Sequence, residues 1–281
     1  MKVGVFNLID PFSGVEHQLE RIRNMGFECA DVTDSHSGGS MGACAGFVAS
    51  TSLDSNPKET LRLFQKYGLE ISTVCAHGWL LDPASPARFG TNEIMKAVRF
   101  AADIGVKYVV TSEDEPYHRE WVGKLDYRQR LTVIADKLYE PLRLAEDYGV
   151  MILMEPHGPI SDSIQGMKDL IAMLDNPALG VNMDTGNSWL GGTDPVEMAK
   201  ELKPYIKHVH WKDLGEKWVP LRGKLHGCGF ADIAIGDGVI DIQGVCDVLR
   251  DLDIPHSTLE IVGDDDILLR SVAFLKALGM G

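Results

Sequence analysis

The sequence predicts a single (β/α)₈ barrel over residues 1–281. Short β-rich runs alternate with longer amphipathic segments along the whole chain, which is typical of repeated βα units and a parallel sheet. Several of the amphipathic segments end in Gly directly before the next strand. The length matches one eight-fold α/β barrel and is short for two ordinary domains, so we expect one domain without an internal boundary.

The predicted strands are short runs of β-branched and apolar residues. They number eight and lie at KVGVFN (2–7), ECADV (28–32), EISTVC (70–75), KYVVTS (107–112), VMILME (150–155), LGVNMD (179–184), KHVHWK (207–212) and STLEIV (257–262).

The segments between the strands are predicted to be the outer helices. GVEHQLERIRNM, KETLRLFQKYG, NEIMKAVRFAADIG and LTVIADKLYEPLRLAEDYG carry apolar residues at three- and four-residue intervals. NMGFE, KYGLE, DIGVK and DYGVM each place Gly where a left-handed helix C-cap requires it. An open doubly wound sheet is the alternative, but the first strand is not followed by the G-x-G-x-x-G spacing typical of dinucleotide-binding sheets.

Two connections are longer than an ordinary βα loop. One follows the second strand (35–57) and the other follows the seventh (213–238). Long loops at the carboxyl ends of barrel strands commonly form the substrate pocket, so we expect both to lie over the barrel mouth.

Composition excludes several classes of function. The formal net charge of −14 would repel a phosphate backbone, so nucleic acid is not an expected partner. The amino-terminal segment has only a short apolar run interrupted by Asn7 and Asp10, which predicts no signal peptide, no membrane span and a cytoplasmic protein. The five cysteines are scattered without a C-x-x-C pair, which argues against a thiolate zinc site.

Ligand-type residues stand at the ends of the last four predicted strands. Because a parallel barrel brings all strand carboxyl ends to one mouth, these side chains should converge although they are distant in sequence. They are Glu155, Asp184, His210 and Glu260.

Three converging carboxylates would repel one another unless a cation or shared protons compensated them, so we expect one divalent metal ion. An oxygen-rich set with one nitrogen suits Mn²⁺, our first expectation, or Mg²⁺ or Co²⁺. Taken singly, each group would be interpreted as a polar strand end paired with a helix N-terminus or a basic side chain. Four consecutive strands with such residues favour the metal site.

The motifs around these four residues are similar to those of the xylose-isomerase-like barrels, most closely the ketose 3-epimerase and inosose dehydratase branches that are often labelled sugar phosphate isomerase/epimerase. The resemblance covers the chain in strand order, and its specific motifs lie in the second half. They are MEPHG around Glu155, NMDTGN around Asp184, HVHWKD around His210, GDG at 236–238 and TLEIVG around Glu260.

The resemblance implies that Glu155, Asp184, His210 and Glu260 hold the metal, and that Glu155 and Glu260 are also the catalytic acid and base on opposite faces of the substrate. It also implies a possible homo-oligomer. One position departs from the epimerase pattern, because Asn187 stands where those enzymes usually have a His. Asn can bond a hydroxyl but cannot act as a titrating base, which puts a relay through that His in doubt.

Further polar residues near the strand ends are candidates for substrate contact: His77, Glu113, His157, Asn187 and Lys212. The alternation of a strand places His208 on the same side as His210 and one layer deeper. For His208, a hydrogen-bonded core role and a role in the site are both open.

Together these features predict a metal-dependent sugar isomerase or epimerase that acts on a small carbohydrate or polyol ketone. It would remove a proton next to the keto group through a metal-bound enediolate. Loss of a β-hydroxyl from the same intermediate would make it a dehydratase or lyase on a keto-inositol or keto-glycoside. A barrel that binds a sugar without catalysis is a third hypothesis. An endonuclease acting at abasic DNA, also within the superfamily, is opposed by the charge and by Asn187.

Overall fold

Eight parallel strands close into a barrel in the computed structural model, which describes residues 1–10, 12–33, 51–78, 80–81, 87–113, 123–227 and 231–281. Each strand pairs with the next along the chain, and β1 pairs with β8 to close the ring. The strands are β1 (Lys2–Val5), β2 (Cys29–Val32), β3 (Glu70–Cys75), β4 (Tyr108–Thr111), β5 (Met151–Met154), β6 (Leu179–Asp184), β7 (Ile206–Trp211) and β8 (His256–Leu259). The predicted (β/α)₈ barrel is confirmed.

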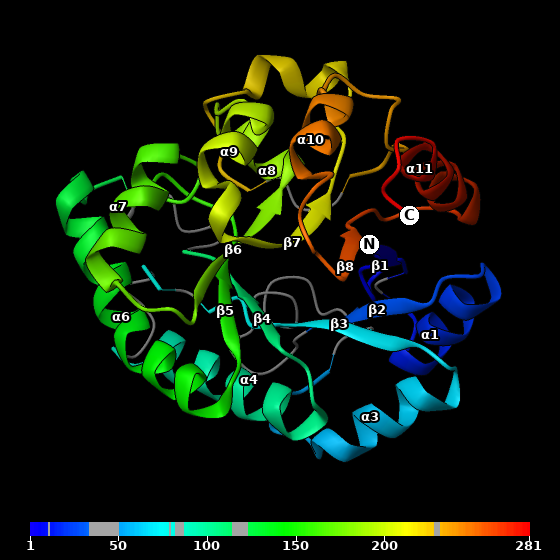
Figure 1. The fold of residues 1–281 in the computed structure, drawn as a ribbon, viewed down its shortest axis with the longest axis horizontal. Helices are drawn as coiled ribbons and strands as arrows, with labels where there is room; N and C mark the ends of the chain where they lie inside the picture. The colour runs from blue at the N-terminus through cyan, green and yellow to red at the C-terminus, as the bar shows by residue number, and fades with distance from the viewer. Residues whose placement is uncertain (11, 34–50, 79, 82–86, 114–122, 228–230) are drawn as a thin grey trace.

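Helices surround the barrel on the outside (Figure 1). The described α-helices are α1 (Val15–Asn24), α3 (Pro57–Lys66), α4 (Phe89–Ile104), α6 (Tyr127–Tyr148), α7 (Ile164–Leu174), α8 (Thr185–Leu190), α9 (Pro195–Leu202), α10 (Ile242–Leu249) and α11 (Asp265–Ala277). Two 3₁₀ helices, η2 (Lys203–Tyr205) and η3 (Glu216–Leu221), flank β7.

Local signals in the sequence explain where several helices begin and end. Asp126 starts α6 with a capping box, in which its side chain accepts from the backbone N–H of Gln129 and the Gln129 side chain bonds back. The predicted glycine ends are confirmed, because Gly26, Gly68, Gly105 and Gly149 have φ values between 63° and 88°. Asp265 and Asp266 lie in the first turn of α11, at the positive end of the helix dipole.

The two ends of the barrel have different contents. We call the carboxyl ends of the strands the barrel mouth and the amino ends the barrel floor. The floor carries Lys2, Glu70 and His256, the first residues of β1, β3 and β8, whose side chains pair at the surface. A continuous apolar core, which includes Phe64, Phe100 and Trp211, fills the layer between strands and helices.

The strand ends differ slightly from the prediction at the mouth. Hydrogen-bonded pairing of β5 and β8 stops at Met154 and Leu259, one residue before the two glutamates that we predicted as strand ends. Their backbones still follow the ladder, since Glu155 N donates to Thr111 O at 2.8 Å and Glu260 N donates to Trp211 O at 3.1 Å. Both glutamates therefore project from fixed backbone at the mouth.

Of the two predicted long connections, the structure describes mainly the second. Most of the segment after β2, residues 34–50, lies outside the described residues. The segment after β7 contains η3 and then runs through Gly227, and Ala231 on its far side bridges to Ile261 just beyond β8. This second connection thus reaches the mouth, as expected for its length.

Candidate metal centre

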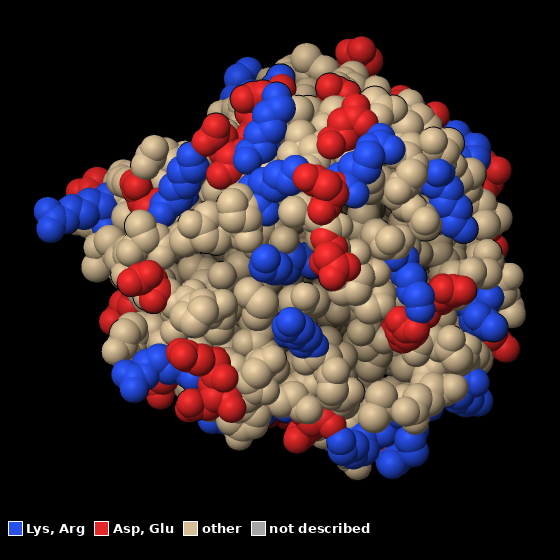
Figure 2. Space-filling view, in the orientation of Figure 1, with Lys and Arg blue, Asp and Glu red and all other residues tan. Residues whose placement is uncertain are grey.

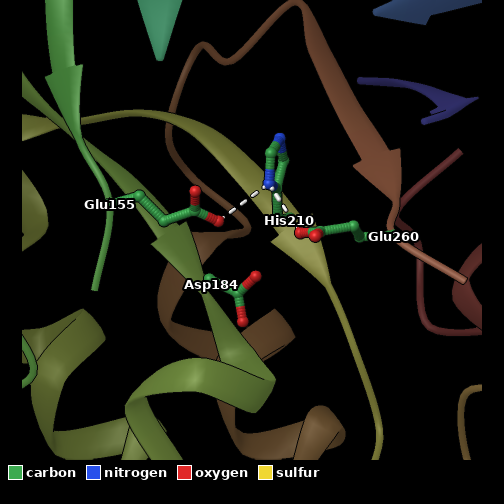
Figure 3. Close-up of side chains that lie close together, drawn as sticks. All are labelled: Glu155, Asp184, His210 and Glu260. Atoms are coloured by element: carbon green, nitrogen blue, oxygen red, sulfur yellow. Dashed lines mark hydrogen bonds and ion pairs between the residues drawn. The ribbon is translucent and has the colours of Figure 1, made fainter. Parts of the chain in front are cut away.

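Four ligand-type side chains converge at the barrel mouth, as predicted. One possible ligand atom from each of Glu155, Asp184, His210 and Glu260 lies within 4.8 Å of the other three. All four side chains are buried, with exposed fractions between 0 and 7%. Asp184 and His210 lie in β6 and β7, whereas Glu155 and Glu260 directly follow β5 and β8. Figure 3 shows the two glutamates on opposite sides of the His210 ring.

The strand register explains why these residues meet. Asp184 of β6 lies directly opposite His210 of β7, and His210 lies opposite Thr258 of β8. Residues opposite one another in a parallel pair point to the same face of the sheet. Two residues deeper, Asn182 pairs with His208 in the same way, which confirms that His208 and His210 share one side.

Hydrogen bonds alone leave this group with an excess of acceptors. His210 Nδ1 lies 2.9 Å from both Glu155 Oε1 and Glu260 Oε2, but one ring nitrogen carries at most one hydrogen. The Lys212 ammonium lies 3.1 Å from Asp184 Oδ2 and 2.9 Å from Glu260 Oε1. If a divalent cation replaced the imidazole proton, its charge together with that of Lys212 would balance the three carboxylates. The residues present therefore fit such an ion.

The pKa shifts in the cluster reflect this crowding. Burial raises the pKa of Asp184 well above its ordinary value; Lys212 opposes the effect, and the nearby Glu260 and Glu155 add to it. Burial also acts to raise the pKa of Glu155, but His210 and His77 outweigh it and hold that pKa well below its usual range. Burial acts to lower the pKa of His210, but Glu155, Asp31 and Glu260 outweigh it and raise that pKa well above its usual value.

Asp184 uses its two oxygens for different tasks. Oδ1 accepts from the backbone N–H of Asn187 at 2.7 Å and so caps α8, while Oδ2 faces Lys212 and the other carboxylates. The cap fixes the carboxylate plane, because the helix start holds one of its oxygens. Asp184 is therefore positioned by backbone as well as by packing.

Lys212 is built into the centre instead of reaching it from the surface. Its side chain is 1% exposed, and Nζ also donates to Asn187 Oδ1 at 3.2 Å. Thr185 Oγ1 bonds the Lys212 backbone at both N and O. Gly186 leaves room for the lysine stem, since a Cβ at this position would lie 2.6 Å from Lys212 Cβ. The predicted pair Asn187 and Lys212 thus meets at the four-residue group.

Asp31 joins the centre without having been predicted. This buried carboxylate of β2 lies 3.5 Å from His210 Nε2, the ring nitrogen that faces away from Glu155 and Glu260. Thr258 Oγ1 donates to Asp31 Oδ1 at 3.0 Å. A carboxylate behind a metal-ligating His commonly fixes its tautomer and ring orientation. The sequence signal was an acidic residue in the otherwise apolar run Cys-Ala-Asp-Val.

His208 occupies the layer below and contacts no carboxylate of the four-residue group. Its Nδ1 lies 2.9 Å from Asn182 Oδ1 and its Nε2 lies 3.2 Å from Thr258 Oγ1. Burial lowers the pKa of His208 to about 3. Of the two roles left open, the contacts are those of a hydrogen-bonded core histidine.

The other predicted substrate contacts fall into two groups. His77 Nε2 lies 3.1 Å from Glu155 Oε2 and so borders the four-residue group, and the His157 ring lies next to that of His77, with 6.3 Å between the ring centroids. Glu113 instead accepts from the backbone N–H groups of Ile160 and Ser161 and anchors the loop after β5. Its role in substrate contact stays a prediction.

On the face drawn in Figure 2, Lys and Arg lie between Asp and Glu and form no broad basic area. Among the described residues, no helix combines the length and the apolar character that crossing a membrane requires.

The xylose isomerase-like TIM barrel family model matches residues 19–278. The chain belongs to this family. It is 27% identical over 231 residues to an inosose dehydratase of Bacillus thuringiensis (strain Al Hakam), covering 75% of this chain and 76% of the relative.

Solved structures share the fold. A D-tagatose 3-epimerase-like protein superposes with a TM-score of 0.75 at 22% identity, covering 99% of this chain and 97% of the other. The IOLI protein, crystallised with a bound zinc atom, superposes with a TM-score of 0.73 at 16% identity, covering 99% and 98%. The sequence relatives of this chain thus include inosose dehydratases, and an epimerase-like protein shares its fold.

Proposed function

We propose that this protein is a divalent-metal-dependent enzyme that removes a proton next to the carbonyl of a sugar or polyol ketone and returns a proton to the other face, which makes it an epimerase or isomerase. The observation that carries the proposal is the placement of two buried glutamates on opposite sides of His210, within one cluster of possible metal ligands. We expect Mn²⁺, with Mg²⁺ or Co²⁺ as alternatives.

Glu155, Asp184, His210 and Glu260 would hold the ion, which as a Lewis acid polarises a carbonyl and favours an enediolate. Glu155 and Glu260 would move the protons, one removing the proton from carbon and the other returning one to the opposite face.

Residues around the ligands would orient the substrate. Lys212 and Asn187 form one hydrogen-bonded pair beside Asp184 and Glu260, where they can donate to substrate oxygens. His77 and His157 border Glu155 on the other side. Both pairs are buried, so water would be scarce around the reacting carbon, which strengthens electrostatic interactions.

Elimination is the second candidate outcome, and two observations favour it. Asn187 replaces the histidine that epimerases of this type usually carry, and the sequence relatives include inosose dehydratases. Proton removal from the carbon next to the ketone is common to both outcomes. They differ in whether a proton returns to that carbon or an oxygen leaves the neighbouring one.

Exchange in deuterated water tests the shared step. The Mn²⁺-loaded protein should incorporate deuterium next to the ketone of at least one member of a panel of ketohexoses, an inosose and 3-keto-glucosides, as read by NMR. A deuterated epimer would identify epimerisation, and an unsaturated ketone would identify elimination. Lack of exchange with every ketone would refute the proposed function.

Glu260→Gln separates catalysis from binding alone. An enzyme should lose turnover much more severely than sugar affinity, because the amide cannot accept or return a proton. His17→Gln on the exposed face of α1 is the matched control and should keep both. Equal binding of sugar by both variants, with no exchange even by the wild type, would instead indicate a non-catalytic binding barrel.

A further inference from the structure

The barrel interior has two chemically different parts. One is the apolar cluster usual for such barrels, formed by Phe6, Leu8, Cys75, Val110 and Leu153. The other is polar, and we call it the polar layer. Its members are at most 2% exposed, and they are Asp31, Ser72, Asn182, His208 and Thr258. Buried polar groups cost folding free energy unless their hydrogen bonds are made, so the contacts within this layer need a close account.

A row of contacts crosses the polar layer from strand to strand. His208 Nδ1 lies 2.9 Å from Oδ1 of the Asn182 amide, and His208 Nε2 lies 3.2 Å from Thr258 Oγ1. Thr258 Oγ1 in turn donates to Asp31 Oδ1 at 3.0 Å. Gly4 of β1 lies opposite Thr258 and has no side chain, which leaves the contact across β1 open. The row therefore begins on β6, passes through β7 and β8, and ends on β2.

The available hydrogens give this row a direction. The Thr258 hydroxyl has one hydrogen and two neighbours, and an ionised carboxylate can only accept, so the hydrogen goes to Asp31. The lone pair of Thr258 Oγ1 then faces His208 Nε2, which must carry a hydrogen. Burial lowers the pKa of His208 to about 3, so the ring is neutral and its Nδ1 accepts.

Asn182 fits the same direction. An amide presents either its oxygen or its NH₂ group to a neighbour by turning over, without a change of shape. With the oxygen toward His208, the Asn182 nitrogen is buried and has no hydrogen-bond partner among the described residues. With the NH₂ group there, it donates to His208 Nδ1. Each member then donates to the next, from Asn182 through His208 and Thr258 to Asp31.

The row ends directly behind a candidate metal ligand. Asp31 Oδ1 accepts from both Thr258 and Ser72, which leaves Oδ2 for another donor. Oδ2 lies 3.5 Å from His210 Nε2, slightly beyond the length of an N–H···O hydrogen bond. Both atoms are buried, and neither has a hydrogen-bond partner within the part of the chain that the structure describes. One lacks a donor and the other lacks an acceptor, so they complement each other.

We propose that the polar layer, acting through Asp31, fixes the hydrogen of His210 on Nε2, so that Nδ1 is the ligand atom offered to a divalent metal ion. His208 and Thr258 are then positioning residues for an ion bound one layer above them. The inference rests on the metal site put forward under Proposed function. It adds which nitrogen binds the ion and which residues control that choice.

The surroundings of His210 agree with this assignment. Its Nδ1 lies 2.9 Å from Glu155 Oε1 and from Glu260 Oε2, so a lone pair there faces the other possible ligands. The His208 ring packs edge-to-face against it, with centroids 5.2 Å apart and an angle of 83° between the planes, which restricts rotation of both rings. A carboxylate behind a ligating imidazole also raises its basicity.

NMR of the protein labelled with ¹⁵N-histidine tests the direction of the row. In the metal-free wild type, His208 should carry its hydrogen on Nε2, and His208→Gln identifies the signals that belong to this ring. In the protein loaded with Zn²⁺, a diamagnetic ion, His210 should carry its hydrogen on Nε2. A hydrogen on Nδ1 of either ring would overturn the proposal. The His208 measurement needs no other variant, so it holds even if one of those below fails to fold.

Thr258→Val breaks the row at one point, because valine has the shape of threonine without the hydroxyl. The His208 hydrogen should then move to Nδ1, where the Asn182 oxygen accepts it. Mn²⁺ affinity, measured by isothermal titration, should fall by about tenfold. Thr258→Ser keeps the hydroxyl and should stay within about threefold of wild type. Ser257→Ala is the matched control, because it removes a buried hydroxyl without a partner among the described residues and should also change affinity by less than about threefold.

A double variant tests whether Thr258 and Asp31 act through one path. Asp31→Asn alone should lower Mn²⁺ affinity by about 30-fold, because an amide cannot accept from all three of its neighbours. Adding Thr258→Val should cause little further loss, so the double variant should bind about 30-fold and not about 300-fold more weakly than wild type. Circular dichroism and Tm in a chelator verify that each variant is folded.

The outcomes separate this inference from the proposed function. If the wild type binds Mn²⁺ but Thr258→Val binds it as tightly as Ser257→Ala does, the inference fails and the proposed function stands. The same holds if the losses from Thr258→Val and Asp31→Asn multiply in the double variant. If the wild type binds no divalent metal ion, the proposed function fails and this inference fails with it.

Discussion

The mouth and the floor of this barrel place charged residues in opposite settings. On the floor, Glu70 pairs with Lys2 at 2.5 Å and with His256 at 2.9 Å, and the Lys2 and Glu70 side chains are about half exposed. At the mouth, Glu260, four residues after His256, is buried in a group of three carboxylates and one imidazole. Surface pairs are screened by water, whereas buried like charges cost folding free energy. The difference indicates that the mouth is arranged for a ligand, and the floor for solubility and closure of the ring.

The largest effect is expected from Asp184→Asn. Asparagine keeps the oxygen that caps α8 but removes a carboxylate whose pKa is raised by burial and by its acidic neighbours. We expect Mn²⁺ affinity to fall by about 10²-fold or more, and the metal-free protein to become more stable by roughly 1–2 kcal/mol. Isothermal titration with Mn²⁺ and thermal unfolding in a chelator measure both. If the metal-free variant had a lower Tm than the metal-free wild type, the buried carboxylates of the mouth would not cost folding free energy, and the contrast with the floor would be wrong.

A smaller effect, on the free energy of unfolding, is expected when the pH is lowered, because His208 is buried in the layer beneath the mouth. The pKa of His208 is about 3 in the folded protein, below its ordinary value of 6.5, because the ring is buried. Between these values the unfolded chain binds a proton that the folded chain does not, so stability is present above pH 6.5 and is lost as the pH falls toward 3. Through His208 the free energy of unfolding should therefore change by up to about 1.4 kcal/mol per pH unit.

Urea unfolding of the metal-free protein at several pH values tests this slope, with His208→Gln as the comparison. The glutamine variant should show a shallower loss of stability below pH 6. If the NMR signal of the His208 ring titrated near pH 6.5 in the folded protein, burial would not lower its pKa, and the contrast with the solvent-exposed floor would not extend to this layer.

The smallest effect is expected from Glu70→Gln. The variant removes the acidic partner of Lys2 and His256 at the floor, where solvent screens each pair. We expect Tm to change by no more than about 2 °C, with deuterium exchange at the mouth unchanged. A marked loss of activity would mean that the two ends of the barrel are coupled.

The fold and the four-residue group were accessible from the sequence because both depend on periodic patterns. Eight apolar runs separated by amphipathic segments specify the strands, and a parallel barrel brings Glu155, Asp184, His210 and Glu260 together without knowledge of any contact. The glycine helix ends followed from a local conformational requirement.

The remaining contacts depend on geometry that the pattern does not contain. Asp31 meets His210 across the interior from a non-adjacent strand, so the contact depends on the stagger of the whole barrel. Asp162 and His226 pair at 2.7 Å from two loops, 64 residues apart, that have no periodicity. Nothing in the sequence indicates that the Glu113 carboxylate accepts from backbone N–H groups of the loop after β5.

Four glycines of the mouth lie directly against buried polar side chains, and this limits how the protein can be re-engineered. Gly158 lies against Glu113, Gly186 against Lys212, Gly191 against Asp162 and Gly227 against His157. Even alanine at any of them would push a polar group out of place while Glu155, Asp184, His210 and Glu260 stayed intact. Directed evolution toward other ketones should therefore find its beneficial changes elsewhere around the opening, and sequence libraries should leave these four codons unrandomised.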